Sequence, residues 1–249
     1  MKQLITILFF PLALIRLLLV LIATAVISIA GLITLWMKGF NRNLQNWVLF
    51  SWGKTVLFIC GVKINRNNLP GMDNYILMPN HRSYLDIFIV ASLTPSSFVG
   101  KSELRRWPFG KTAVKISNLI LVDRKNSRSL LTTMGKIKDC VEQGIPVTLF
   151  PEGTTFKGPL TKHFKNGSFK IAADAQIPVI PMAIEYRDKN DAWVDDDTFV
   201  GHFFRQLGKP RTHVDIRYGE PVMDTDYQQL QKEVKETIDN MLGEIDASD

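Results

Sequence analysis

A histidine and an aspartate stand five positions apart in the segment NHRSYLD, residues 80–86. An imidazole with a pKa near 6.5 can take a proton from a hydroxyl group at neutral pH, and a carboxylate can hold that ring in one tautomer. On an ideal helix, positions five apart diverge by roughly 140°. The two side chains can therefore meet only if the histidine precedes a helix and folds back over its first turn. His81 and Asp86 are the candidate catalytic pair of this sequence.

A structural interpretation of the same segment competes with the catalytic one. Ser83 and Asp86 match the capping-box pattern, in which a serine caps the first turn of a helix and an acid three residues later reaches back. The cap accounts for Asp86 but not for His81, which falls where an apolar strand gives way to a loop. The two interpretations are compatible, because the cap supplies the fold-back. Ser83 is also a candidate nucleophile, although the G-x-S-x-G elbow of serine hydrolases is missing.

A second segment of interest is IPVTLFPEGTTFKGP, residues 145–159, where an apolar strand runs directly into a Pro-Glu-Gly turn. Glu152 stands at the end of that strand. Cations near a histidine suit a phosphate-bearing substrate, but they could equally form a solvated or membrane-facing surface. The basic residues that fall in or beside loops after predicted strands are Lys101, Arg105, Arg106, Arg124, Lys125, Lys157, Lys162 and Lys165.

The elements that must position these residues alternate along the chain. Helical patterns are expected at residues 44–60, entered at Asn43, and at 127–143, 166–176 and 227–245. The intervening apolar segments are nearly continuous in apolar residues, which is typical of strands covered on both faces by helices. We therefore expect an α/β fold with a mixed, largely parallel sheet flanked by helices. The predicted strands are residues 61–64, 74–78, 97–100, 118–122, 146–150, 178–184 and 213–218.

The N-terminal segment predicts a membrane anchor. Residues 17–37 carry no charge and are long enough to cross a bilayer. Trp36 and Lys38 mark an interface where a cleaved leader would show a small-residue cleavage site. Pro11 and Arg16 leave a second possibility open, two helices packed as a hairpin within one leaflet. We expect residues 1–42 to form the anchor and residues 43–249 the catalytic domain, whose motif-bearing core is about residues 60–222.

Composition and charge limit the partners. The 249 residues carry a formal net charge of +6, with a pI near 9.3, which favours an anionic partner such as nucleic acid, a phosphorylated substrate or a membrane surface. The anchor favours the membrane over nucleic acid. More basic residues follow the apolar run than precede it, so a spanning helix would place the catalytic domain on the cytosolic side. Two cysteines make no disulfide framework, and three scattered histidines suggest no metal site: His163, His202 and His213.

The order of these motifs resembles the glycerolipid acyltransferase family typified by 1-acyl-sn-glycerol-3-phosphate acyltransferase. The blocks run over roughly residues 60–222 and comprise NHRSYLD, KSELRRWP from Lys101 to Pro108, VDR ending at Arg124, FPEGT at residues 150–154, and the strand IPVIPMAI. Each block alone is weak, but the set in this order behind an apolar anchor is specific.

Three positions depart from the family pattern. The family usually continues FPEGT with an arginine that binds phosphate, and here Thr155 stands in its place. Lys157 or Lys165 could supply a charge there, but a lysine is a point charge and not a bidentate fork. Asn118 replaces a common glycine, which is tolerable because asparagine accepts left-handed backbone angles. Gly110 arrives one position earlier than expected.

The resemblance implies a reaction as well as a fold. His81 would act as general base on the free hydroxyl of 1-acyl-sn-glycerol-3-phosphate, and Asp86 would orient its ring, giving phosphatidic acid. Lys101 and Arg124 would hold the acceptor phosphate, while Glu152, Gly153 and Thr154 would shape the acceptor site through backbone amides and the carboxylate. The acyl donor would be an acyl-CoA or acyl carrier protein thioester, with no metal and no further cofactor. The alternatives are another lyso-acceptor, either a lysophospholipid with a larger headgroup or a lyso-aminolipid, and a non-catalytic adaptor for anionic membranes.

Overall fold

The computed structural model describes residues 2–106, 109–123, 127–194 and 197–248. Within these residues, seven strands form one sheet in the order β1-β7-β6-β2-β5-β3-β4. Neighbouring strands run parallel, except that β6 and β7 are antiparallel. The predicted mixed, largely parallel sheet is confirmed. The strands are β1 Val62–Arg66, β2 Ile76–Pro79, β3 Ser97–Lys101, β4 Ile120–Val122, β5 Val147–Thr148, β6 Val179–Tyr186 and β7 Thr212–Tyr218.

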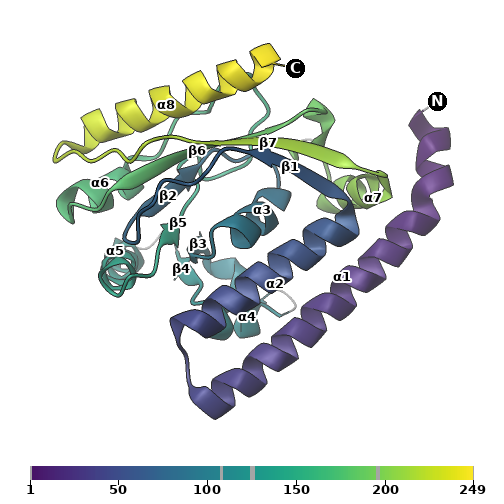
Figure 1. Ribbon diagram of the computed structural model, residues 1–249, viewed down its shortest axis with the longest axis horizontal. Coiled ribbons are helices and arrows are strands. Elements are labelled where there is room, and N and C mark those ends of the chain that lie inside the picture. Colours follow the sequence, from purple (N-terminus) through teal and green to yellow (C-terminus); the bar gives the residue numbers. More distant parts are fainter. Residues whose placement is uncertain (1, 107–108, 124–126, 195–196, 249) are drawn as a thin grey trace.

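Helices cover both faces of this sheet (Figure 1). On one face α5 (Ser127–Glu142), α6 (Asn166–Asp174) and α8 (Tyr227–Ser248) pack on residues such as Ile76 and Met78 of β2. On the other face α2 (Arg42–Cys60) and α3 (Leu85–Leu93) pack on Leu77 of the same strand. Successive residues of a strand point to opposite faces, so a strand between two helical layers must be apolar at every position. This explains the continuous apolar segments of the sequence.

The sequence patterns did not predict two short helices. Helix α4, Gly110–Ile116, follows the turn Ser102–Arg106, and α7, Phe199–Gly208, lies in the segment between β6 and β7. Gly110 is required where it stands, because a Cβ atom there would lie 2.0 Å from the Leu104 carbonyl oxygen. The N-cap of α2 also differs from the prediction. Its Asn41 side chain accepts a hydrogen bond from the Leu44 N–H, so the helix begins at Arg42 and not after Asn43.

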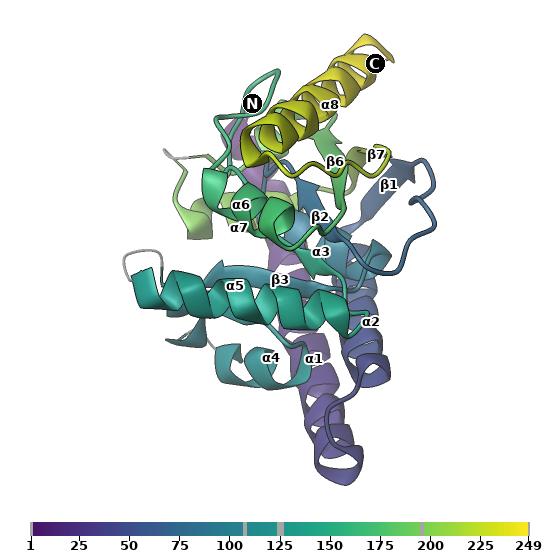
Figure 2. The same ribbon diagram turned by 90° about the vertical axis from the view of Figure 1, so that its left-hand side faces the viewer.

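Helix α1, Lys2–Lys38, is continuous through Pro11 and Arg16, so the break that a hairpin within the first 40 residues needs is not there. Instead α1 runs antiparallel to α2, and the two helices project together below the sheet (Figures 1 and 2). Ala13 is buried in this packing. The Arg16 guanidinium donates to the carbonyl oxygens of Leu207, Lys209 and Pro210, at the end of α7. Arginine at the C-terminal end of a helix satisfies carbonyls that lack helical partners.

The outward face of α1 is apolar and exposed. Residues Phe10–Lys38 are long and apolar enough to cross a membrane, by length and composition. Among the exposed apolar side chains of α1, one set recurs every three or four positions, as a stripe on a helix does, and further exposed apolar residues flank it. A stripe of this size is unfavourable in water and is typical of a surface that contacts lipid or another protein. It comprises Ile15, Leu18, Ile22, Val26, Ile29, Ile33 and Trp36.

The two catalytic candidates and the FPEGT segment leave the sheet at the same edge. β2 lies between β6 and β5, and β5 is its parallel neighbour. Because the carboxyl ends of parallel strands meet at one edge of a sheet, the loops after Pro79 and Thr148 are brought side by side. The fold therefore unites two motifs that are about 70 positions apart in the sequence.

Candidate active site

His81 and Asp86 are in direct contact, with His81 Nδ1 2.8 Å from Asp86 Oδ2. His81 follows the end of β2, and Asp86 lies in the first turn of α3, so the histidine folds back over the helix as the spacing requires. The His81 side chain is 16% exposed and that of Asp86 is fully buried. A proton on Nδ1, shared with the carboxylate, leaves the lone pair of Nε2 on the neutral ring to accept another proton.

The Asp86 carboxylate is fixed through both oxygens. Oδ2 also accepts the backbone N–H groups of Arg82, at 2.7 Å, and Ser83, at 2.9 Å. Oδ1 accepts the hydroxyl of Tyr186 at 2.7 Å. Burial, and then the neighbouring Asp86 carboxylate, raise the pKa of Tyr186 well above its ordinary value, so the phenol keeps its proton and donates. Three donors besides His81 therefore fix the orientation of the Asp86 carboxylate toward the imidazole: two backbone N–H groups and the Tyr186 hydroxyl.

Tyr186 is a member of the site that the sequence analysis missed. It lies 100 positions after Asp86, at the end of β6. Because β6 pairs with β2 in the sheet, Tyr186 comes close to the Asp86 carboxylate. The spacing of residues in the sequence does not reveal which strands pair. An aromatic hydroxyl at the carboxyl end of a predicted strand was the only available signal.

The capping box forms in part. Asp86 accepts the Ser83 N–H, as the pattern predicts. The Asp86 N–H, however, donates to the Ser83 carbonyl oxygen and not to the serine hydroxyl. Ser83 Oγ instead lies 3.4 Å from the Leu85 nitrogen, and the serine is completely buried. A buried hydroxyl in a turn has no access to substrate, so the geometry opposes the serine nucleophile.

The FPEGTT loop encloses His81. The rings of His81 and Phe150 stack with centroids 4.0 Å apart and an interplanar angle of 23°. The Phe156 N–H donates to the His81 carbonyl oxygen at 2.8 Å. The imidazole is thus held on one side by Asp86 and on one face by an aromatic ring. Both constraints reduce the rotamers open to it, which favours a pre-organised base.

A pocket of about 300 Å³ opens beside His81. It brings together three of the residues expected to bind the acceptor, Lys101, Gly153 and Thr154, with the catalytic candidate. Thr155, which replaces the family arginine, also faces it. Arg124, the other expected phosphate ligand, lies outside the described residues. The lining consists of His81, Lys101, Gly153, Thr154, Thr155, Trp193, Val194 and Asp197.

Glu152 turns inward behind the pocket. It is 2% exposed, and its Oε1 accepts the backbone N–H of His81 at 3.2 Å. Its Oε2 has no hydrogen-bond partner in the part of the chain that the structure describes. Burial raises the pKa of this carboxyl to about 7, against smaller lowering effects of the His81 N–H and the Arg82 charge. The side chain therefore holds the backbone of His81 in place. The resemblance suggests that Glu152 shapes the acceptor site directly, but it is not among the residues that line the pocket.

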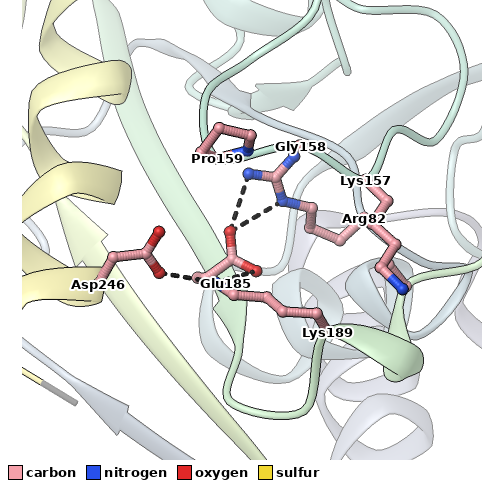
Figure 3. A pocket seen from close by; sticks show the side chains of 8 residues that line it. Arg82, Lys157, Gly158, Pro159, Glu185, Lys189 and Asp246 are labelled. Atoms are coloured by element: carbon pink, nitrogen blue, oxygen red, sulfur yellow. Dashed lines mark hydrogen bonds and ion pairs between the residues drawn. The ribbon is translucent and has the colours of Figure 1, made fainter.

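A buried ion pair lies behind the loop that carries His81 (Figure 3). The Arg82 guanidinium donates twice to Glu185 Oε2, from Nε at 3.1 Å and from Nη2 at 2.8 Å, and once to the Phe156 carbonyl oxygen. Both side chains of the pair are at most 5% exposed. The pair ties the loop after β2 to β6 and to the FPEGTT loop. Lys157, considered above as a replacement for the arginine, lines the pocket next to this pair and not the pocket of His81.

The departure at Asn118 is accommodated as expected. Asn118 has a φ of 52°, in the left-handed region. Its side-chain amide donates to Ser97 Oγ and Cys140 Sγ, which fixes the turn that leads into β4. Within the described residues, no group of three or more histidine, cysteine or acidic side chains is arranged to hold a metal ion.

The chain matches the family model described as Acyltransferase over residues 62–185. A lyso-ornithine lipid O-acyltransferase of Rhizobium meliloti is 27% identical over 83% of this chain and 76% of its own length. A second lyso-ornithine lipid O-acyltransferase, from Pseudomonas aeruginosa, is 30% identical over 57% of each chain. A 1-acyl-sn-glycerol-3-phosphate acyltransferase of Borreliella burgdorferi is 32% identical over 53% of this chain and 54% of its own length.

A solved structure agrees with the fold. The crystal structure of the 1-acyl-sn-glycerophosphate acyltransferase PlsC from Thermotoga maritima superposes with a TM-score of 0.73, covering 99% of this chain and 98% of that one at 23% identity. The chain belongs to the glycerolipid acyltransferase family and is an acyltransferase. Membership implies an acyl donor and a lyso-lipid acceptor as substrates.

Proposed function

We propose that this protein is a membrane-bound O-acyltransferase that esterifies the free hydroxyl of a lyso-lipid, with His81 as general base. The observation that carries the proposal is the 2.8 Å contact between His81 Nδ1 and Asp86 Oδ2 at the edge of a pocket that also contains Lys101. A histidine held in one tautomer by a buried carboxylate is the arrangement that removes a hydroxyl proton efficiently.

The reaction follows from this geometry without an acyl-enzyme. His81 Nε2 takes the proton of the acceptor hydroxyl as its oxygen attacks the carbonyl carbon of the thioester. Asp86 stabilises the imidazolium that forms. The carbon–sulfur bond then breaks, and the imidazolium returns its proton to the leaving thiolate, so the products are an ester and a free thiol. Acyl-CoA and acyl carrier protein are both acidic donors that a basic protein attracts.

Two acceptors come into consideration. The family resemblance and relatives such as that of Borreliella burgdorferi support 1-acyl-sn-glycerol-3-phosphate, which would give phosphatidic acid. Thr155 weakens this candidate, because among the residues that the structure describes no arginine lines the pocket of His81 to make the bidentate contact that a phosphomonoester favours. A lyso-aminolipid such as lyso-ornithine lipid needs only one cation for its carboxylate. On this ground we favour the lyso-aminolipid, with lysophosphatidate as the second candidate.

The membrane anchor serves this function. Both the acceptor and the product are lipids, and moving a chain into water costs roughly 0.8 kcal/mol per methylene. The antiparallel pair of α1 and α2, placed on the bilayer with the exposed stripe of α1 in lipid, would remove most of that cost. We place the catalytic domain on the cytosolic side, where both thioester donors are found.

A competition assay tests the proposal. Detergent-purified protein is given a labelled palmitoyl thioester of CoA or acyl carrier protein together with equal amounts of lyso-ornithine lipid and lysophosphatidate. We expect labelled diacylated ornithine lipid to exceed labelled phosphatidate. The reverse order would return lysophosphatidate to first place. A folded protein that acylates neither lipid with either donor would contradict the proposal as a whole.

A further inference from the structure

The pocket of His81 contains an acidic side chain as well as the basic Lys101. Asp197 lines the same pocket as His81 and Lys101. Its pKa is lowered, chiefly by a hydrogen bond from Arg205, so it is anionic at neutral pH. A dianionic phosphate drawn to Lys101 would meet this carboxylate in a pocket of about 300 Å³. Like charges in one pocket repel, so the part of the Asp197 charge that Arg205 does not offset acts against a phosphomonoester.

An aromatic ring stands beside the acid. Trp193 lines the pocket, and its indole N–H donates to the Asp197 carbonyl oxygen at 3.0 Å. The ring makes edge contacts with Tyr84 and Phe199, at centroid distances of 6.0 and 5.7 Å. Its position is therefore fixed by one hydrogen bond and two aromatic neighbours. Tryptophan is the aromatic side chain that attracts cations most strongly, and a carboxylate next to it adds a charge partner.

This part of the pocket is tied to the loop that carries His81. The Trp193 backbone N–H donates to the Arg82 carbonyl oxygen at 2.9 Å, one residue after His81. Arg82 is itself anchored by Glu185. A group held between Trp193 and Asp197 is thus held at a fixed place relative to the base. Lys101, which lines the same pocket, is exposed and forms no ion pair with the residues that the structure describes, so its charge is available to an anionic group.

From these contacts we infer that Trp193 and Asp197 form a subsite for an ammonium group of the acceptor, and that Lys101 takes the anionic group of the same headgroup. The inference rests on the proposed acyl transfer and narrows its acceptor to a zwitterion. Arg205 also forms an ion pair with Asp197, with its Nη2 2.6 Å from Oδ2, and is not among the residues that line the pocket. It holds the carboxylate in place.

The test compares acceptors that differ only in the ammonium charge. Lyso-ornithine lipid is assayed beside the same lipid with its side-chain amine acetylated, in wild-type protein and in Asp197→Asn and Trp193→Leu. We expect the wild type to prefer the free amine by about 10-fold in kcat/KM. Each substitution should reduce that ratio to near one, mainly by lowering kcat/KM for the free amine. Asp188→Asn, which removes a carboxylate paired with Lys209 outside this pocket, should leave the ratio unchanged.

Two results would overturn the subsite. One is a wild type that uses both lipids equally well. The other is a loss in Asp197→Asn that is the same for both lipids, because that would indicate a structural role. Binding of the two lipids to His81→Ala, measured by titration calorimetry in detergent, separates the subsite from the reaction. Preferential binding of the free amine that Asp197→Asn abolishes would support the subsite even if acyl transfer failed, and equal binding would overturn it.

Discussion

Tyr186 donates its hydroxyl to Asp86 Oδ1 at 2.7 Å, so a residue at the end of one strand orients the carboxylate that in turn orients the imidazole of His81. Because the phenol makes no contact with substrate in this account, Tyr186 is a positioning residue. Its effect reaches the reaction only through the direction of Asp86.

Tyr186→Phe should therefore slow the reaction without preventing folding. A buried hydrogen bond to a charged group contributes about 1.5–3 kcal/mol, and if half of that is lost from the transition state, kcat falls by about 3- to 12-fold while KM changes little. Steady-state acyl transfer checks this. Tyr218→Phe removes a buried hydroxyl that pairs with Thr94 and not with the dyad, so it should reduce stability but not kcat. Equal kcat values in the two variants would contradict the positioning role.

The buried carboxyl of Glu152 should make stability depend on pH. Its pKa is about 7 in the folded protein, against an ordinary value of 4.5 for a glutamate exposed to water in the unfolded chain. Since the folded state binds the proton more tightly, this contribution to stability is complete below pH 4.5 and is lost as the pH rises to 7. The loss is about 3 kcal/mol by linkage.

Glu152→Gln removes the titration and keeps an oxygen for the His81 N–H. Relative to the wild type, the variant should therefore gain about 3 kcal/mol in free energy of unfolding between pH 4.5 and pH 8. Urea denaturation in detergent at several pH values measures this difference. A difference that does not change with pH would show that Glu152 is ionised in the folded protein throughout this range.

Removing one member of the Arg82–Glu185 pair should lower the free energy of unfolding strongly, whereas replacing both members with apolar residues should lower it little. Arg82→Met leaves a buried carboxylate without its main partner, and such a change destabilises by about 3–5 kcal/mol. Lys189, 3.3 Å from Glu185 Oε1, offsets part of this. The double variant Arg82→Met with Glu185→Met should recover most of the lost stability. Lys189→Met alone should cost at most about 1 kcal/mol, because that side chain is half-exposed. A double variant as unstable as the single one would contradict this account.

Ser83→Ala should retain acyl transfer within about three-fold, because the hydroxyl is buried and the hydrogen bond that it accepts from the Leu85 N–H is long. The same assay measures this effect, and wild-type protein should not react with a serine-directed phosphonate. Loss of activity in this variant, together with labelling of Ser83, would restore the nucleophile that the sequence left open.

The sequence patterns predicted the strands well because strands covered on both faces leave a local signal, a continuous apolar run such as that of β6. They also predicted the pair of His81 and Asp86, whose partners are five positions apart. They did not reveal Tyr186, Glu185 or Trp193 as parts of the site. Each of these is placed by the order of strands in the sheet or by a long loop, and no local spacing carries that information. The hydrophobic run of α1 was equally visible, but its packing along α2 depends on Ala13 and on the contacts of Arg16 with the end of α7.

The central claim is that His81 is the catalytic base, and the most direct measurement is acyl transfer by His81→Ala beside the wild type and His213→Ala. His213 lies on the exposed side of β7, away from the pocket, and serves as the matched control. We expect the His81 variant to lose at least about 10²-fold in kcat with its unfolding transition unchanged, and His213→Ala to keep full activity. A folded His81→Ala protein that transfers acyl chains at the wild-type rate would contradict the account.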